Sequence, residues 1–280
     1  MVFRWLAGRG ARQKQIDQQM SALTPNVWRR AVKAHPFLRG LSVGDSEALR
    51  QRTAWILASK VFTGVHGLHL TFDMQLSIAL QAALPVMNLD VRLYEGWTEI
   101  IVYPGGFLIP RTEMDEAGVV HEYVEEASGE AWEGGPVVLS WEDAHSTQGE
   151  AVNVVIHEFV HKLDLYSGDA QGVPSLSAHP EISPALWRRV LQASFSHFEQ
   201  ALFLAEEAIP HDIDPDSDEA ACWFEHLPLD PYAATDLAEF FAVSAEAFFV
   251  HPEPLAQSYP DWYGLLARYF RQDPLTRLFG

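Results

Sequence analysis

The sequence predicts an α+β fold: a mainly helical single domain with a small, mostly antiparallel sheet packed beside the helix that carries His157 and His161. Three observations support this prediction. Apolar residues recur at helical spacing early in the 280-residue chain and again after about residue 148. The middle third instead holds short apolar runs separated by turn residues. Helices, then a cluster of strands, then helices is an order typical of α+β proteins.

Two segments are expected along the chain. Residues 1–43 form a leading helical segment, and residues 44–280 form the domain that contains the histidine pair. Within the second segment, one helix is predicted from about Asp45 to Val61 and another from Asp73 to Ala83. Asp and Ser favour the starts of such helices, and Pro85 ends the second one.

The middle of the chain changes to strand patterns, and helices then return. Residues rich in Val, Ile and Tyr predict strands at 98–103, 107–110, 119–125 and 136–141. The helical pattern after them predicts helices at 149–165, 185–207, 235–250 and 259–271. The acidic, turn-rich stretch 209–218 is expected to be a loop.

Charge and composition exclude several classes of protein. The net charge of −19 argues against a chain that clamps nucleic acid directly, although eleven Lys and Arg gather in residues 1–60 against three Asp and Glu. A solvated terminal segment is the simpler explanation of this basic region, and an acidic partner is the alternative. No run of about 18 apolar residues is present, so no membrane span is expected.

The expected location is the cytoplasm. A single cysteine, Cys222, excludes an intramolecular disulfide and suits a reducing compartment. Arg4 interrupts the one apolar stretch at the N-terminus, which a secretory signal would need uninterrupted. Cys222 itself is expected to be a structural thiol rather than a nucleophile.

The segment His157-Glu158-Phe159-Val160-His161 carries the strongest chemical signal. Two histidines four residues apart on a helix project from one face, where both can bind the same Zn²⁺. Glu158 lies beside that position and can take a proton from a water that the ion activates. The competing interpretation is two ordinary helix histidines with a solvated Glu158, but the apolar residues around them favour a buried site.

A catalytic zinc site of this kind needs a third protein ligand. Ser167 occupies the position where metzincins have a third histidine, so that class is disfavoured. Asp164, Asp169 and acids on a later helix remain candidates, and Glu239 is the strongest because it interrupts an otherwise apolar stretch. Asp164 is better placed either to orient a histidine or to cap the end of the helix.

Two further residues near Glu239 are candidates for supporting roles. Glu246 lies seven residues after Glu239 on the same helical face, where it can orient a ligand or make a structural hydrogen bond. Tyr232 lies seven residues before Glu239 and could stabilise an oxyanion. From position alone, an aromatic residue that anchors the preceding loop is the commoner role.

From about residue 28 to 278 the chain resembles the Mlc titration factor A family, and three stretches carry this resemblance. They are His157 to Asp164 with Gly172-Val173-Pro174, Tyr232 to Phe249, and Gln272 to Leu275. The family comprises bacterial cytoplasmic zinc peptidases with aminopeptidase-like activity, distantly similar in their core to the anthrax lethal factor. Leu237 and Phe240 depart from residues found in some members, but neither is a ligand position.

The resemblance implies a role for each matching residue. His157, His161 and Glu239 would bind zinc, Glu158 would be the catalytic base, and Tyr232 would assist it. Residues 44–280 would then be a zinc metallopeptidase domain that acts on a peptide substrate.

Two functions are compatible with these residues. The first is zinc-dependent, aminopeptidase-like hydrolysis, in which strand 136–141 could align the substrate as a sheet edge or be an ordinary strand. The second is a regulatory binding protein that sequesters a glucose-repressor-type transcription factor, as the founding family member does. A purely structural zinc site is disfavoured, because only three protein ligands are identifiable and a closed site usually has four.

Overall fold

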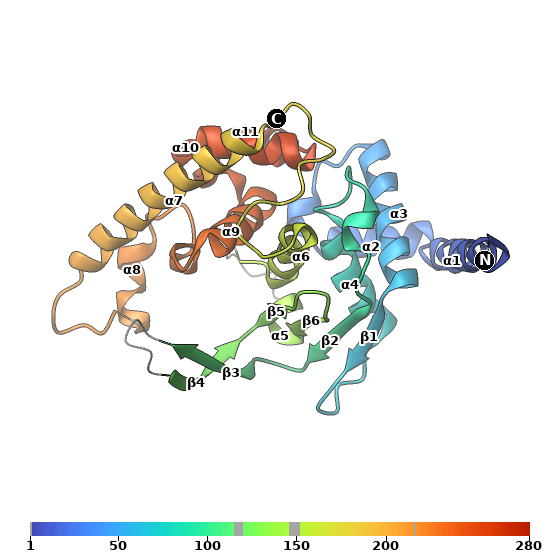
Figure 1. Ribbon diagram of the computed structural model, residues 1–280, viewed down its shortest axis with the longest axis horizontal. Coiled ribbons are helices and arrows are strands. Elements are labelled where there is room, and N and C mark those ends of the chain that lie inside the picture. Colours follow the sequence, from blue (N-terminus) through green and yellow to red (C-terminus); the bar gives the residue numbers. More distant parts are fainter. Residues whose placement is uncertain (1, 115–119, 146–151, 216) are drawn as a thin grey trace.

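A computed structural model describes residues 2–114, 120–145, 152–215 and 217–280 (Figure 1). It confirms the predicted α+β class, with helices above and beside a small sheet. One hydrophobic core extends from Leu23 to Phe270, so the fold is a single domain. The predicted boundary at residue 43 stays a prediction. Trp28 and Leu38, which precede it, pack in the same core as the residues that follow it.

The main sheet has the strand order β1-β2-β6-β5. These strands are Val61–Gly64 (β1), Glu99–Tyr103 (β2), Val137–Ser140 (β6) and Gly129–Ala131 (β5). Since β1 and β6 both run parallel to β2 and only β5 is antiparallel, the prediction of a mostly antiparallel sheet is wrong. The reason lies in the connections. Helix α4 (Phe72–Ala83) crosses between β1 and β2 and returns the chain to the same end of the sheet.

A separate hairpin lies between β2 and β5 in the sequence. Its strands, β3 (Phe107–Met114) and β4 (Val120–Ala127), pair antiparallel along their whole length and extend away from the main sheet (Figure 1). The predicted strands at 107–110 and 119–125 are therefore confirmed in part, and both are longer than expected. Residue 119 lies outside the described residues.

Of the two roles left open for strand 136–141, the ordinary interior strand is the one the structure has. The predicted strand 136–141 is β6, which is paired on both sides and cannot receive a substrate strand. The edge strands of this sheet are β1 and β5, and β5 is a three-residue strand that was not predicted. It lies directly against helix α6 (Val154–Asp164).

The N-terminal part is helical as predicted, and the helix expected at 45–61 begins and ends two residues earlier. The N-terminal helices are α1 (Val2–Ala22), α2 (Pro25–Lys33) and α3 (Val43–Ser59), and α3 packs against α4. Thr24 and Ser42 cap α2 and α3 by accepting hydrogen bonds from backbone amides in the first turn of each helix. Helix α1 contacts α3, and α2 contacts α4.

The C-terminal half consists of helices around α6. They are α5 (Trp141–His145), α7 (Pro184–Glu207), α8 (Ala221–Phe224), α9 (Leu237–Val250), α10 (Pro252–Ser258), α11 (Pro260–Phe270) and α12 (Pro274–Phe279). The predicted helix 149–165 begins later, at Val154, and residues 149–151 lie outside the described residues. The short helices α10 and α12 were not predicted.

Helices α6 and α9 form the centre of the core. Helix α9 is apolar on nearly every side, and it buries Phe240, Phe241, Phe248 and Phe249 completely. A helix that is apolar all round is typical of a protein interior. None of the described helices combines the length and the hydropathy that a membrane crossing requires.

A buried lysine lies at the side of the core, away from α9. Lys60 Nζ donates hydrogen bonds to the carbonyl oxygens of Tyr94 and Trp97, at 2.5 and 2.7 Å, and lies 3.5 Å from the centre of the Trp97 ring. Burial and the positive charges of Lys162 and Arg12 lower the pKa of Lys60 to about 7, from an ordinary value of 10.5.

This shift predicts a pH dependence of stability. Between about pH 7 and pH 10.5 the unfolded chain binds a proton at Lys60 that the folded chain does not, so the free energy of unfolding should rise with pH. The slope should reach up to about 1.4 kcal/mol per pH unit. Urea denaturation of wild type and Lys60→Met at pH 7 and 9 measures it. Equal pH slopes in the two proteins would contradict the prediction.

Candidate metal centre

Helix α6 presents both motif histidines from one face. Asn153 caps the helix, since its Oδ1 accepts a hydrogen bond from Ile156 N at 2.9 Å. The His157 and His161 rings lie one turn apart, with centroids separated by 4.6 Å. Five apolar residues anchor the helix in the core and leave it little freedom to turn: Val155, Ile156, Phe159, Val160 and Leu163.

Helix α9 brings Glu239 to the histidine pair. Asp236 caps α9 through hydrogen bonds from the backbone amides of Ala238 and Glu239, which places Glu239 in the first turn. Glu239 Oε2 lies 3.0 Å from His157 Nε2 and 3.2 Å from His161 Nε2. The two nitrogens are 3.0 Å apart. Residues 78 apart in the chain thus meet at one point.

The donor atoms fit a tetrahedral cation. One nitrogen or oxygen from each of His157, His161 and Glu239 lies within 4.8 Å of the other two. Ligands at zinc distances of about 2.0–2.1 Å are separated from one another by roughly 3.3 Å in a tetrahedral arrangement. The observed separations are close to this value. Two imidazoles and a carboxylate are also the ligand types that zinc prefers.

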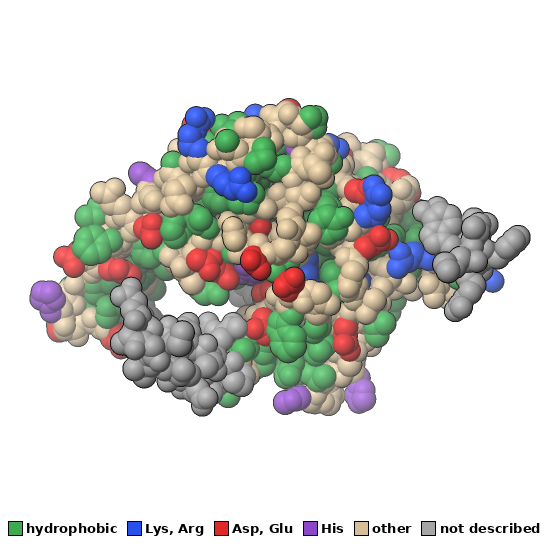
Figure 2. All heavy atoms as spheres, in the orientation of Figure 1, with side chains coloured by type: hydrophobic (Ala, Val, Ile, Leu, Met, Phe, Trp, Pro, Cys, Tyr) green, Lys and Arg blue, Asp and Glu red, His purple; other side chains and the backbone are tan. Residues whose placement is uncertain are grey.

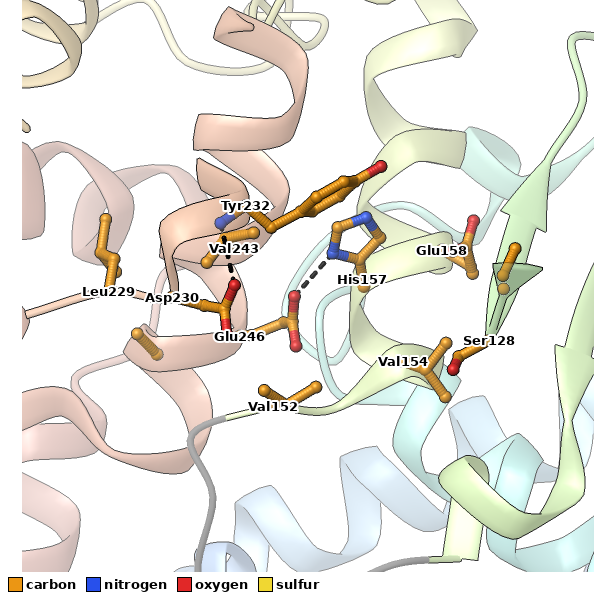
Figure 3. A pocket seen from close by; sticks show the side chains of 13 residues that line it. Ser128, Val152, Val154, His157, Glu158, Leu229, Asp230, Tyr232, Val243 and Glu246 are labelled. Carbon is orange, nitrogen blue, oxygen red and sulfur yellow. Dashed lines mark hydrogen bonds and ion pairs between the residues drawn. The ribbon is translucent and has the colours of Figure 1, made fainter. Parts of the chain in front are cut away.

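Glu246 holds the first histidine from behind (Figure 3). Its Oε1 lies 2.6 Å from His157 Nδ1, and its Oε2 accepts a hydrogen bond from Asn153 N at 2.5 Å. This contact leaves His157 Nε2 free to face Glu239. A carboxylate behind a histidine ligand fixes the ring and its tautomer in many metal sites. The alternative that Glu246 makes only a structural hydrogen bond is less consistent with this contact.

The electrostatics of the three donors favour a bound cation. Burial lowers the pKa of His157, but Glu246 and Glu239 outweigh burial and leave this pKa well above its ordinary value. Burial raises the pKa of Glu239, but hydrogen bonds from both histidines hold it far below the usual range. A metal ion would satisfy the same negative charge and displace the proton from His157.

Glu158 lies beside this cluster and is 4% exposed. Burial raises its pKa to about 7, although the positive charges of His157 and His161 oppose the shift. Its Oε2 has no hydrogen-bond partner among the described residues. A buried carboxylate with a pKa near neutrality and an open acceptor atom can exchange protons with a bound water.

The edge strand approaches Glu158 so closely that only glycine fits. A Cβ atom on Gly129 would lie 2.3 Å from Glu158 Oε1 and 2.6 Å from Val154 Cγ2. Gly129→Ala is therefore expected to displace either β5 or the Glu158 carboxylate. Because a displacement of about 1 Å can cost on the order of 100-fold in rate, kcat should fall by that order while bound zinc remains.

Gly264→Ala is the matched control for this substitution. A Cβ atom on Gly264, in helix α11, meets no atom within 4 Å, so activity should be unchanged. Steady-state kinetics and metal analysis of both variants test the prediction. Wild-type kcat in Gly129→Ala would show that this close approach is irrelevant to catalysis.

Tyr232 lies on a short 3₁₀ turn, Pro231–Ala234, before α9. Its ring lies over His157, with centroids 6.1 Å apart, and 45% of the residue is exposed (Figure 3). Asp230 caps this turn by accepting a hydrogen bond from Tyr232 N at 2.9 Å. The structure thus brings Tyr232 to the edge of the cluster, where a substrate could reach it.

Asp164 lies away from the cluster. Its two carboxylate oxygens accept hydrogen bonds from the backbone amides of Gly172 and Val173, at 2.6 and 2.8 Å. Of its two predicted roles, these contacts favour the structural one, which holds the loop after α6. Asp169, another candidate third ligand, is exposed and is not one of the grouped donors.

A cavity of about 280 Å³ opens beside His157 and Glu158. In Figure 3, Glu158, Val154 and Ser128 lie on one side of it, and Asp230, Glu246 and Leu229 lie on the other. Acidic side chains are frequent across the middle of the face shown in Figure 2, while Lys and Arg lie mainly toward its upper and right-hand edges. Three carboxylate residues, Glu158, Asp230 and Glu246, line the cavity, so a ligand inside it meets negative charge.

Comparison with known proteins gives a metallopeptidase family for this chain. The family described as glucose-regulated metallo-peptidase M90 matches residues 9–271. The chain belongs to this family. It is 38% identical over 262 residues to the Mlc titration factor A of Serratia proteamaculans, covering 93% of this chain and 92% of that protein. It is 36% identical over 264 residues to the Mlc titration factor A of Pectobacterium atrosepticum, covering 94% and 92%.

Membership of the family implies a metal ion, and His157, His161 and Glu239 are the grouped donors that could hold it. Sequence reasoning named these residues but missed Asn153, Gly129 and Asp230. Asn153 had a detectable signal, because Asn directly before an apolar helix is a common cap. Asp230 had one too, because Asp directly before Pro is a common start of a helical turn. Gly129 had none, since its importance depends on a contact with a distant segment.

Proposed function

We propose that this protein is a cytoplasmic zinc-dependent peptidase with aminopeptidase-like activity. The observation that carries the proposal is the convergence of His157, His161 and Glu239 beside a buried Glu158. Family membership supports a metallopeptidase, and zinc suits the two imidazoles and one carboxylate. The lone Cys222 is compatible with a reducing compartment.

Each residue would have a defined part in hydrolysis. His157, His161 and Glu239 would hold the ion, and Glu246 would keep His157 in the orientation for binding. Zinc, when bound, would polarise the scissile carbonyl and acidify a water. Glu158 would take a proton from that water and pass it to the leaving amine. The Tyr232 hydroxyl would donate a hydrogen bond to the oxyanion that develops on the carbonyl oxygen.

The edge strand β5 supports a peptide as the substrate. Among the described strands it is the last of the sheet, next to β6 alone, and it lies directly against the helix that carries Glu158. An extended peptide could add to this edge through main-chain hydrogen bonds, which would place a peptide bond near Glu158. The substrate would then occupy the cavity that β5, α6 and α9 enclose.

Metal analysis combined with cleavage of an unbiased peptide library tests this function. We expect one zinc per chain, hydrolysis that a chelator abolishes, and recovery of hydrolysis when zinc is returned. The library also reports whether cleavage begins at a free amino terminus. A zinc-loaded protein that cleaves no member of the library would contradict the proposal.

A second candidate function is sequestration of a transcription repressor, with hydrolysis secondary. The observation that favours it is the name of the two relatives, Mlc titration factor A. A repressor of the glucose type would be the partner. Zinc-loaded Glu158→Gln separates the two functions in cells: if the folded variant still relieves repression, binding is the primary role. Loss of the effect with loss of hydrolysis would favour the peptidase.

A further inference from the structure

The cavity beside the metal centre combines apolar walls with one carboxylate that the metal centre does not use. Its apolar lining comes from the end of β4, from α6 and the segment just before it, and from α9 and the segment before it. These residues are Ala127, Val152, Val154, Leu229, Val243 and Ala247. Three carboxylate residues also line it, namely Glu158, Asp230 and Glu246.

The three carboxylates differ in what they already contact. Both oxygens of Glu246 are used, by His157 Nδ1 and by Asn153 N. Glu158 is buried against Gly129 and is the proposed proton carrier. Asp230 is exposed, and its contact in this region is the hydrogen bond that Oδ1 accepts from Tyr232 N. Asp230 lines the cavity, and no Lys or Arg is among the described residues that line it with Asp230.

The balance of charge around the cavity favours a positively charged ligand. With Glu239 included, four carboxylates surround the site, and one divalent ion neutralises two negative charges. No Lys or Arg is found among the described lining residues. The nearest lysine of α6, Lys162, donates its hydrogen bonds to the carbonyl oxygens of Trp132 and Gly135 and does not line the cavity.

A second feature that favours a polar ligand is a buried acceptor atom in the cavity wall. Glu158 is 4% exposed, and its Oε2 has no hydrogen-bond partner among the described residues. Glu158 and Asp230 lie on opposite sides of the same space (Figure 3). A ligand in the cavity can therefore contact the proposed proton carrier and Asp230 at once, while its aliphatic part packs on the valines and Leu229.

We propose that Asp230 is a specificity-determining residue that binds a cationic group of the peptide substrate beside the metal centre. This inference rests on the proposed function. The ligand chemistry is an ammonium or guanidinium group on an aliphatic stem, and such side chains bury the stem while the charge reaches a polar partner. The charge can belong to a lysine or arginine side chain or to the amino terminus of the peptide.

Asp230→Asn tests the proposal with little change in shape. Asn can still accept the hydrogen bond from Tyr232 N, and it caps helical turns as well as Asp does. The substrates are matched peptides that carry lysine or norleucine at one position, each with a free or an acetylated amino terminus. For wild type, kcat/KM should be higher for cationic members of each pair, and this preference should weaken as salt is added.

In Asp230→Asn the ratio of kcat/KM between cationic and neutral peptides should fall by roughly 10- to 100-fold, the range expected for one charged hydrogen bond. If the ratio falls between free and acetylated peptides, the cation is the amino terminus. If it falls between lysine and norleucine peptides, the cation is a side chain. Asp212→Asn, which removes an exposed charge outside the cavity, should leave both ratios at the wild-type value.

Calorimetric titration separates this inference from the proposed function. Zinc-loaded Glu158→Gln is titrated with the same peptides, with and without the Asp230→Asn change, so that binding is measured without hydrolysis. A 10-fold or greater loss of affinity for cationic peptides alone supports the proposal, even if wild type cleaves none of them. Equal affinities for cationic and neutral peptides, or an equal loss for both classes in Asp230→Asn, would overturn it.

Discussion

Glu158→Gln is expected to lower kcat for peptide hydrolysis by about 10²- to 10⁴-fold, which is the usual contribution of a general base. The glutamine amide keeps the size of the side chain but cannot accept a proton from water. Zinc should remain bound at the wild-type stoichiometry, because Glu158 is not one of the three grouped donors. Steady-state kinetics and metal analysis on the same preparation measure both effects.

Glu133→Gln is the control for this substitution. Glu133 is exposed in the turn that joins β5 and β6, so its replacement removes the same charge close to the site without touching the cavity. Its kcat should match that of wild type. If zinc-loaded Glu158→Gln were as active as wild type, another group would have to move the proton and the proposed mechanism would be wrong.

Glu239→Gln is expected to weaken zinc binding more than any other change to a carboxylate of the site. An amide is a poor zinc ligand, and the substitution removes the negative charge that lies 3.0 and 3.2 Å from the two histidine nitrogens. Affinity should fall by more than roughly 100-fold, the upper end of what loss of an outer hydrogen-bond partner costs. Competition with a chromogenic chelator measures the change, and activity should fall with zinc content.

Glu246→Gln is the graded comparison for Glu239→Gln. It keeps all three grouped donors but weakens the contact with His157 Nδ1, so zinc affinity should fall by roughly 10- to 100-fold. Glu253→Gln, a change at a half-buried residue in the first turn of α10 and away from the grouped donors, should have no effect. If Glu239→Gln held zinc as tightly as wild type, Glu239 would not be the third ligand.

Local patterns predicted the parts of the fold that local interactions decide. The apolar spacing around His157 and the lone Glu239 in an apolar stretch located two helices whose caps and faces bring both residues together. Burial of those helices follows from their own composition. The three donors could therefore be located from the sequence, because each lies on a helix with a clear apolar pattern.

The errors concern features that depend on distant contacts. Nothing within β1, β2 or β6 determines that they pair in parallel, because the direction of pairing follows from how the connecting segments cross the sheet. Strand β5 is three residues long and begins at Gly129, so it has too little pattern to be recognised. Asp164 resembled a partner of the histidines in spacing, but its carboxylate contacts backbone amides of the following loop instead.

The packing of α6 against α9 also determines when the ion joins the protein. The two helices meet through many buried apolar side chains of the common core, and not only through the three donors. In small zinc domains the ion is part of the folding reaction, and its removal unfolds the chain. If zinc binds as proposed, its removal should leave the chain folded, and the supply of zinc would change activity without unfolding the protein.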